Sequence, residues 1–229
     1  GMLVASLVGI DTRATMDIDS TLKALPLNEE DAVRIVNEII RIHVEDGISF
    51  EIVKAAEIMD DFEYPGVRLV LEARLDRMKQ RIKIDLSTDD VITPSAIRYS
   101  YPLMFEDRNI ELMTYTPETL LAEKIQTILA RGITTTRMRD YYDVYEIVVG
   151  NKVSIDKEVL AEAFTATCMK RKTIFGSEQV EKIVNEISTD EGLSNLWDLY
   201  KNDNFYVGDI KWTVVCEAVC AYIKDNISK

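Results

Sequence analysis

The stretch "TRATMDIDS", residues 12–20, holds two aspartates, Asp17 and Asp19, that are separated by one apolar residue. In a β-strand successive side chains alternate between the two faces, so both carboxylates would project from one face while Met16 and Ile18 face a core. Two like charges on one face repel each other unless water or a cation screens them. The pattern therefore predicts a short strand, with two interpretations open: a solvated strand end or a cation-binding pair.

Composition and charge exclude several classes of protein. With 229 residues the chain can form one large domain or two small ones, and its net charge of −13 argues against an extended basic surface for nucleic acid. A local site remains possible, because a metal ion can bring phosphate to carboxylates. His43 is the only histidine, which excludes a histidine zinc site and histidine-based catalysis. We expect it near the C-terminal end of a helix.

Cysteine usage and hydropathy indicate the compartment. Cys168, Cys216 and Cys220 form no even disulfide framework, and the spacing of the last two is typical of core residues on one helix face. No apolar run approaches the length of a membrane span, and no secretory signal pattern is present. We expect a cytoplasmic protein with no membrane contact.

The chain changes character near residue 115. Before it, alternating or β-branched runs predict strands at 48–58, 67–75 and 80–88. A helix is predicted in "LNEEDAVRIVNEIIRIHVEDG" (27–47), with Asn28 as N-cap and Gly47 as its stop.

After residue 115 the pattern is helical. In "TPETLLAEKIQTILARG" (116–132), Thr116 is the expected N-cap, Pro117 the first helical residue and Gly132 the terminator. Further helices are expected at 137–149, 155–170, 177–188, 190–201 and 209–227. The fold class is therefore α+β, with one domain over residues 1–115 and an all-helical domain over 116–229.

A second strand-like segment, "RIKIDLS" (81–87), places one carboxylate, Asp85, among apolar residues. An acid in an apolar strand is costly unless it is paired or binds a metal. Asp85 is either a salt-bridge partner of Arg81 or Lys83, or a third carboxylate for phosphoryl chemistry with two metal ions.

Two signals lie in the helical half. Lys124 falls on the apolar face of its helix, where it either extends its ammonium to water or holds the charge against an anion such as a triphosphate. In "RMRDYYDVYEIV" (137–148), Asp140 and Asp143 share one helix face beside Arg139. Both acids also suit the first turn of a helix, where they interact favourably with the helix dipole.

Taken together, "TRATMDID", "IKIDLS", "YTPETLLAEKIQTILARG" and "RMRDYYDVYEI" resemble the AbiEii/AbiGii-type nucleotidyltransferase-like toxins, a branch of the DNA polymerase β-like nucleotidyltransferase superfamily. The resemblance runs from residue 1 to about 150, and the Leu-Leu-Ala-Glu-Lys and Arg-Asp-x-x-Asp motifs are its most specific part. It implies a small mixed β-sheet core with flanking helices, and a helical domain that closes over the nucleotide.

The resemblance also implies roles for individual residues. Catalytic roles fall on Asp17, Asp19, Asp85, Asp140 and Asp143, of which the first three would be ligands of Mg²⁺ or Mn²⁺. Asp85 would also orient the attacking hydroxyl, while Lys124, Lys83 and Arg139 would bind substrate. The implied partners are an NTP, an RNA or tRNA acceptor and a cognate antitoxin encoded nearby.

In the family a Gly-Gly or Gly-Ser turn precedes a helix just before the Asp-x-Asp pair. Here the chain begins at that place, with Gly1 resembling a cloning remnant and Met2 to Leu7 standing as the helix. We therefore expect a chain that lacks the N-terminal segment with the phosphate-gripping turn. The expected function is Mg²⁺-dependent nucleotide transfer, and the alternative is a truncated, non-catalytic relative that acts as a binding or regulatory partner. A metal-dependent phosphohydrolase is a third choice.

Overall fold

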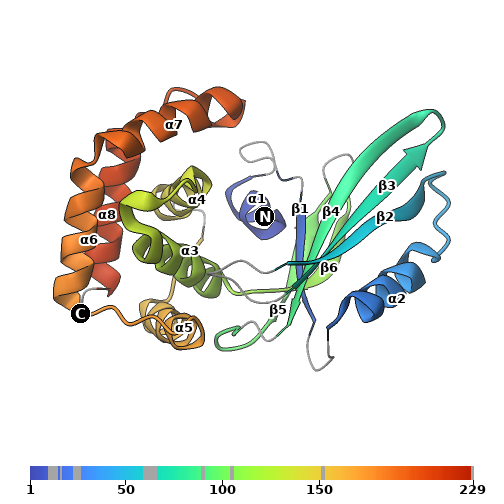
Figure 1. The fold of residues 1–229 in the computed structure, drawn as a ribbon, viewed down its shortest axis with the longest axis horizontal. Coiled ribbons are helices and arrows are strands. Elements are labelled where there is room, and N and C mark those ends of the chain that lie inside the picture. The colour runs from blue at the N-terminus through green and yellow to red at the C-terminus, as the bar shows by residue number, and fades with distance from the viewer. Residues whose placement is uncertain are drawn as a thin grey trace. The chain divides into compact units, whose positions relative to one another are not determined.

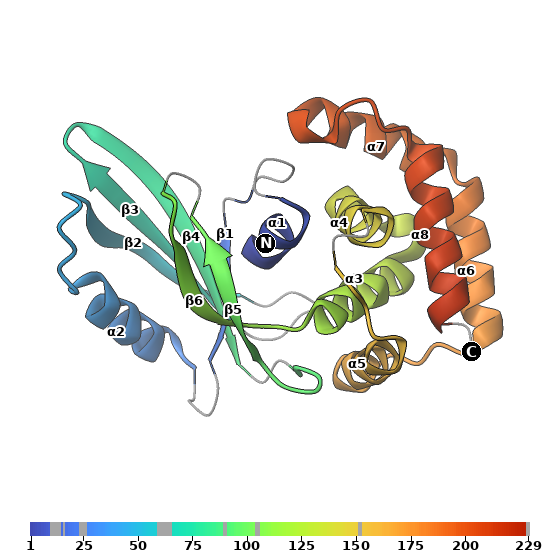
Figure 2. The same cartoon turned by 180° about the vertical axis from the view of Figure 1, so that it is seen from behind.

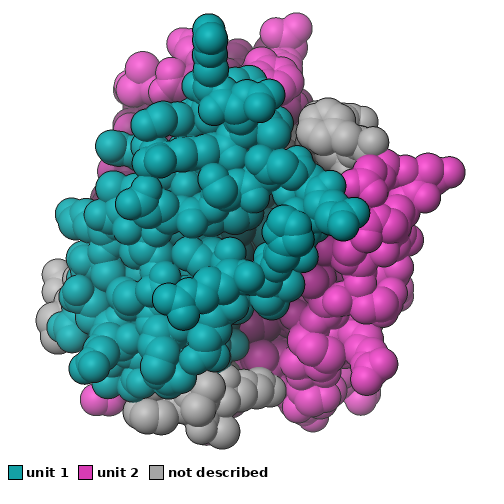
Figure 3. All heavy atoms as spheres, turned by 90° about the vertical axis from the view of Figure 1, so that its right-hand side faces the viewer, with its two compact units in different colours: residues 1–2, 15–90 teal, residues 3–14, 91–229 magenta. Residues whose placement is uncertain are grey.

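The computed structural model describes residues 1–9, 15, 17–22, 27–58, 66–88, 91–103, 106–150 and 153–227. By its internal contacts the chain divides into two compact units, coloured separately in Figure 3. Unit 1 comprises Gly1–Met2 and Thr15–Asp90, and unit 2 comprises Leu3–Ala14 and Val91–Lys229. Residues 12–14 and Met16 of the opening stretch lie outside the described residues.

The described residues of unit 1 form a four-stranded mixed sheet in the order β1-β4-β3-β2. The strands are β1 (Asp17–Leu22), β2 (Ser49–Ile58), β3 (Gly66–Leu75) and β4 (Met78–Thr88). β1 runs parallel to β4, whereas β3 is antiparallel to both β4 and β2. The strands predicted at 48–58, 67–75 and 80–88 are confirmed to within two residues at each end.

Alternation along the strands gives the sheet one apolar and one polar face. Val67, Leu69 and Leu71 of β3 and Leu86 of β4 are buried and pack together with Ala32 and Val36 of α2 (Glu29–Ile40). Figure 1 shows this helix beside β2 and β3, and Figure 2 shows the same arrangement from behind. Residues at odd positions of β1 and β4, which include the aspartates, therefore project from the other face.

The N-terminus of α2 is as expected, but its C-terminus is not. Asn28 caps the helix by accepting a hydrogen bond from the backbone N–H of Asp31 at 2.8 Å. The prediction that the helix continues to Gly47 was wrong, because it ends at Ile40 and leaves His43 beyond it. Ile42 and Val44 are 67% and 58% exposed, so the apolar pattern after Ile40 meets no core that would stabilise further turns.

Unit 2 contains the helices and one hairpin. Its elements are α1 (Met2–Val8, whose first residue belongs to unit 1), β5 (Ile97–Pro102), β6 (Asn109–Thr114), α3 (Pro117–Arg131), η1 (Gly132–Thr134), α4 (Met138–Val149), α5 (Lys157–Lys170), α6 (Ser177–Thr189), α7 (Glu191–Asp203), η2 (Phe205–Val207) and α8 (Trp212–Ile227). The helices expected after residue 115 are all present, with ends shifted by up to three residues.

By internal contacts the two units divide near residue 90, while the domains expected over 1–115 and 116–229 stay a prediction. The antiparallel β5–β6 hairpin, which was not predicted from the sequence, belongs to unit 2.

Hydrogen bonds join the start of α3 to the segment around Thr93. Thr116, the N-cap of α3, donates a hydrogen bond to the carbonyl oxygen of Thr93 at 2.8 Å. Thr119 bonds the same peptide segment through both the N–H and the carbonyl oxygen of Thr93.

An aromatic group fills the core of unit 2. Trp197 is fully buried, donates its indole N–H to the carbonyl oxygen of Ile210 at 2.9 Å, and packs against Tyr142 and Trp212. Cys168, Cys216 and Cys220 are buried and free, as expected of core residues. No helix within the described ranges is long and apolar enough to cross a membrane.

Candidate functional site

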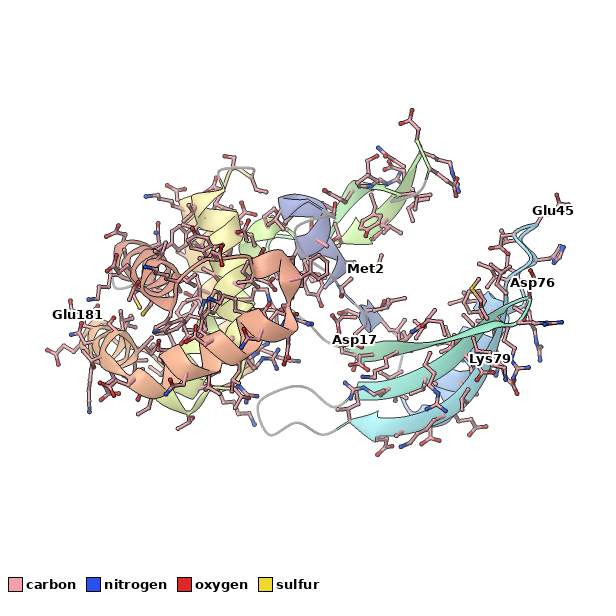
Figure 4. All side chains as sticks on the ribbon, turned by 90° about the horizontal axis from the view of Figure 1, so that it is seen from above. Met2, Asp17, Glu45, Asp76, Lys79 and Glu181 are labelled. Atoms are coloured by element: carbon pink, nitrogen blue, oxygen red, sulfur yellow. The ribbon has the colours of Figure 1, made fainter. Side chains whose placement is uncertain are left out.

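Unit 1 brings the three predicted metal ligands to one face of neighbouring strands. β1 and β4 are in parallel register with Asp19 opposite Asp85 and Asp17 opposite Lys83. Residues directly opposite each other in a parallel pair project from the same face, so all four side chains lie on the polar face. Figure 4 shows Asp17 at the start of β1, with Asp76 and Lys79 marking the β3–β4 turn at the other end of the sheet.

Cations balance this acidic group. The ammonium of Lys83 lies 3.9 Å from Oδ1 of Asp17, and the N-terminal ammonium of Gly1 lies 3.5 Å from Oδ2 of Asp19. The side chains of Asp17 and Asp19 are 39% and 65% exposed, so water also screens them. These two carboxylates are therefore accessible to a ligand from solution.

Asp85 has a partner that the sequence analysis did not consider. Arg68 of β3, directly opposite Asp85 in the antiparallel register, donates Nε–H to Oδ1 at 2.7 Å and Nη2–H to Oδ2 at 2.6 Å. This bond raises the pKa of Arg68 above its usual value, and the carboxylates of Asp85, Asp17 and Asp19 act in the same direction. The salt-bridge interpretation of Asp85 is thus realised with Arg68 and not with Arg81 or Lys83.

The three aspartates have the right chemistry for metal ligands, but in this structure they are not arranged as a metal site. Carboxylate oxygens are the donors that Mg²⁺ prefers. However, nowhere in the part of the chain that the structure describes do three His, Cys, Asp or Glu side chains gather closely enough to hold a metal ion. In addition, the guanidinium of Arg68 contacts both carboxylate oxygens of Asp85.

In unit 2 the predicted site residues Lys124, Asp140 and Asp143 lie together between α3 and α4. The ammonium of Lys124 lies 2.9 Å from Oδ1 of Asp140 and 2.7 Å from Oδ2 of Asp143, and Arg137 donates Nε–H to Oδ2 of Asp140 at 2.9 Å. The side chains of Lys124, Asp140 and Asp143 are 12%, 8% and 0% exposed. Lys124 is thus largely shielded from water, and two carboxylates of its own chain hold its charge.

The charges of this network stabilise one another. Burial opposes the ionised forms, but Asp140 and Asp143 outweigh it and raise the pKa of Lys124 above its usual value. Burial likewise opposes ionisation of Asp140, yet Lys124 and Arg137 hold the pKa of Asp140 below its usual range. A buried group of this kind is destabilised strongly when one member is removed, because the others are left uncompensated.

A depression of about 350 Å³ opens beside the network. Its lining residues are Thr136, Arg137, Met138, Arg139, Asp140, Tyr200 and Asn204. Arg139 is exposed, in contrast to its buried neighbours Met138 and Asp140. Of the predicted substrate-binding residues of unit 2, Arg139 is therefore the one whose charge is available on a concave surface.

Comparison with known proteins agrees with this assembly of motifs. A model of the family described as nucleotidyl transferase AbiEii toxin, type IV TA system, matches residues 1–215. The chain belongs to the AbiEii family. No curated protein matches it. JHP933 from Helicobacter pylori has a similar structure at 14% identity, with a TM-score of 0.43, 97% of this chain covered and 83% of that one.

A second Helicobacter pylori structure, described as that of a candidate nucleotidyltransferase, matches at 13% identity with a TM-score of 0.38 and covers 91% of this chain and 80% of that one. The description of this family is that of nucleotidyltransferase toxins from type IV toxin–antitoxin systems. The mixed sheet followed by helices agrees with the fold class expected from the sequence. Two residues that sequence reasoning missed, Arg68 and Arg137, each neutralise a predicted catalytic acid.

Proposed function

We propose that this AbiEii protein transfers a nucleotide from an NTP to an RNA acceptor with the help of Mg²⁺ or Mn²⁺. The observation that carries the proposal is the parallel register of β1 and β4, which sets Asp19 opposite Asp85 on the face that Asp17 also occupies. Two carboxylates on one strand and a third on its neighbour form the donor pattern for phosphoryl chemistry with divalent ions.

Asp17 and Asp19 suit a divalent ion as they stand, because they share a face and are exposed. When bound, such an ion supplies neutralisation of the charge on the nucleotide phosphates. Asp85, freed from Arg68, would then orient the acceptor hydroxyl and take up its proton. Lys83, beside Asp17, would attract and hold phosphate oxygens.

The helical unit contributes in a different way from that implied by its motifs. A phosphate could bind Lys124 only if the ammonium left Asp140 and Asp143, with which it forms short ion pairs. We therefore propose that Lys124, Asp140 and Asp143 hold α3 and α4 in place, and that exposed Arg139 binds an anionic part of the substrate in the depression. A cytoplasmic location and a cognate antitoxin, as for a toxin acting on RNA, complete the proposal.

The experiment incubates the protein with each of the four NTPs labelled at the α-phosphate, total RNA, and Mg²⁺ or Mn²⁺. Label should enter RNA, and pyrophosphate should be released. The Asp17→Asn/Asp19→Asn double variant should transfer nothing, whereas Glu57→Gln, which removes an exposed acid from β2 of the same sheet, should transfer normally. Release of inorganic phosphate without labelled RNA would indicate a phosphohydrolase.

The alternative, a non-catalytic binding partner, is favoured by one observation. Both Asp85 and Lys124 are already neutralised by side chains of this chain. If no NTP labels RNA and no NTP binds in the presence of a divalent ion, this alternative replaces the catalytic proposal.

A further inference from the structure

Arg68 and Asp85 form a two-pronged guanidinium–carboxylate pair, in which both N–H···O bonds go to one acid. Two parallel N–H···O bonds match the geometry of a carboxylate and equally that of a phosphate. The side chain of Arg68 is 45% exposed and that of Asp85 is 22% exposed, so the pair lies at the surface of the polar face. A ligand that arrives from solution can therefore reach Arg68 without unfolding the sheet.

The surroundings of Arg68 distinguish it from an ordinary surface salt bridge. Asp17 and Asp19, like Asp85, stabilise the positive charge of Arg68. The guanidinium therefore lies within the electrostatic field of all three predicted metal ligands. A divalent cation would be attracted by the same three carboxylates. Arg68 and such an ion would therefore compete for the carboxylate of Asp85, both oxygens of which Arg68 contacts.

A polyphosphate changes the balance of this competition. It offers Arg68 oxygen acceptors that carry more negative charge than one carboxylate and fit the same fork. Once the guanidinium turns to the phosphates, both oxygens of Asp85 become available to a cation. Binding of the polyphosphate and of the ion would then favour each other, and this coupling must be reciprocal.

We propose that Arg68 is a positioning residue that occupies Asp85 in the free protein and releases it to a divalent ion when a polyphosphate binds its guanidinium. The proposal rests on the proposed function, since it assigns the polyphosphate to the NTP that the acidic face would bind. It makes two predictions of opposite sign for one substitution. Loss of Arg68 should strengthen binding of the ion alone and weaken binding of polyphosphate alone.

The test uses the full chain and two simple probes, Mn²⁺ alone and inorganic tripolyphosphate alone, each followed by isothermal titration calorimetry. Arg68→Gln should bind Mn²⁺ about tenfold more tightly than the wild type, because a unit charge a few ångströms from the ion is removed. The same variant should bind tripolyphosphate about tenfold more weakly. Arg68→Lys, which keeps the charge but loses the fork, should lie between the two for both probes.

Arg74 provides a matched control on the same strand. It is also 45% exposed and binds two acids, with Nε 2.6 Å from Glu72 and Nη2 2.8 Å from Glu51. It lies opposite Lys79 in the β3–β4 register, at the end of the sheet far from Asp17 (Figure 4). Arg74→Gln should leave both affinities unchanged.

The outcomes separate this inference from the proposed function. If Arg68→Gln binds Mn²⁺ no more tightly than the wild type, or loses affinity for both probes together, Arg68 is a structural salt bridge and the inference is overturned. Opposite shifts support the inference even where no NTP labels RNA, in which case the proposed function alone fails. If Arg68→Gln does not fold, as judged by circular dichroism, Arg68→Lys decides between the outcomes by the same two titrations.

Discussion

Lys124 and Asp143 meet at 2.7 Å between α3 and α4, and the carboxylate of Asp143 has no exposed surface. The eighteen residues between them in the chain include the end of one helix and the start of the next. The ion pair thus joins the two motifs by which the sequence resembles its family. Its first measurable role is in the stability of unit 2.

Replacing Lys124 by methionine should lower the free energy of unfolding by about 3–5 kcal/mol, because the buried carboxylates of Asp140 and Asp143 would both lose the ammonium that pairs with them. Urea denaturation followed by tryptophan fluorescence measures this change, since Trp197 and Trp212 both lie in the core of unit 2. Lys182→Met, which removes an exposed lysine 3.9 Å from Glu186, is the control and should change stability by less than about 0.5 kcal/mol. Equal stability of the two variants would show that the buried network contributes nothing net.

The network should also make the protein sensitive to acid. The folded state holds the pKa of Asp140 below its usual range, so near pH 4 the unfolded chain binds more protons at this residue than the folded one. The contribution of Asp140 is therefore complete above that pH and is lost as the pH falls through the folded value. Denaturation between pH 7 and pH 3 should show a shallower acid decline for Asp140→Asn than for the wild type.

Asp198→Asn is the control for that titration, because its carboxylate is 65% exposed and lies 4.0 Å from Lys201. It should reproduce the acid decline of the wild type. A wild-type slope in Asp140→Asn would assign the acid sensitivity to other groups.

The N-cap of α3 should contribute to stability through two partners. Thr116 accepts a hydrogen bond from the N–H of Thr119 at 3.1 Å and donates one to the carbonyl oxygen of Thr93. Thr116→Ala removes both and should destabilise the protein by about 1–2 kcal/mol, while Thr116→Ser keeps the hydroxyl and should recover most of the loss. Chemical denaturation of the three proteins makes the comparison, and equal losses for alanine and serine would show that packing of the methyl group, not capping, is what matters.

Divalent ions should raise the melting temperature of the wild type, because an ion that binds only the folded state stabilises it by mass action. Asp19→Asn should lose most of this shift, since it removes the more exposed of the two carboxylates on β1. Differential scanning calorimetry with and without Mg²⁺ measures the effect. A wild type that melts at the same temperature in both buffers would mean that Asp17 and Asp19 are simply solvated acids.

Local patterns predicted most of the elements but few of the contacts. Alternating residues identified β2, β3 and β4, and Thr116, Pro117 and Gly132 placed both ends of α3, because strand faces and helix caps depend on residues that are near in sequence. Gly132 has a φ of +50°, which explains why a glycine ends this helix. The end of α2 was misjudged, since whether its apolar stripe continues depends on which part of it the sheet covers.

The partners of the charged residues could not be read in the same way. Arg68 meets Asp85 through the register of β3 on β4, and a shift of one residue would put the guanidinium on the opposite face. Helix periodicity indicates the face of the helix on which Lys124 lies, but not which other helix packs against that face. Lys124 was therefore expected to point to water or to an external anion. A charged residue with apolar neighbours was the available signal in each segment, and it indicated a need for a partner without identifying one.

The parallel pairing of β1 with β4 has a consequence for the order of folding. Thr21 and Ser87, hydrogen-bonded across these strands, are 66 residues apart in sequence, whereas β2, β3 and β4 follow one another closely. Closing so long a loop costs entropy that only later contacts repay, so we expect the three-stranded meander to form first and β1 to dock last. During synthesis β1 leaves the ribosome well before its partner, and the acidic strand must wait unpaired. A nascent chain that folds in this order has no assembled acidic face until β4 has emerged.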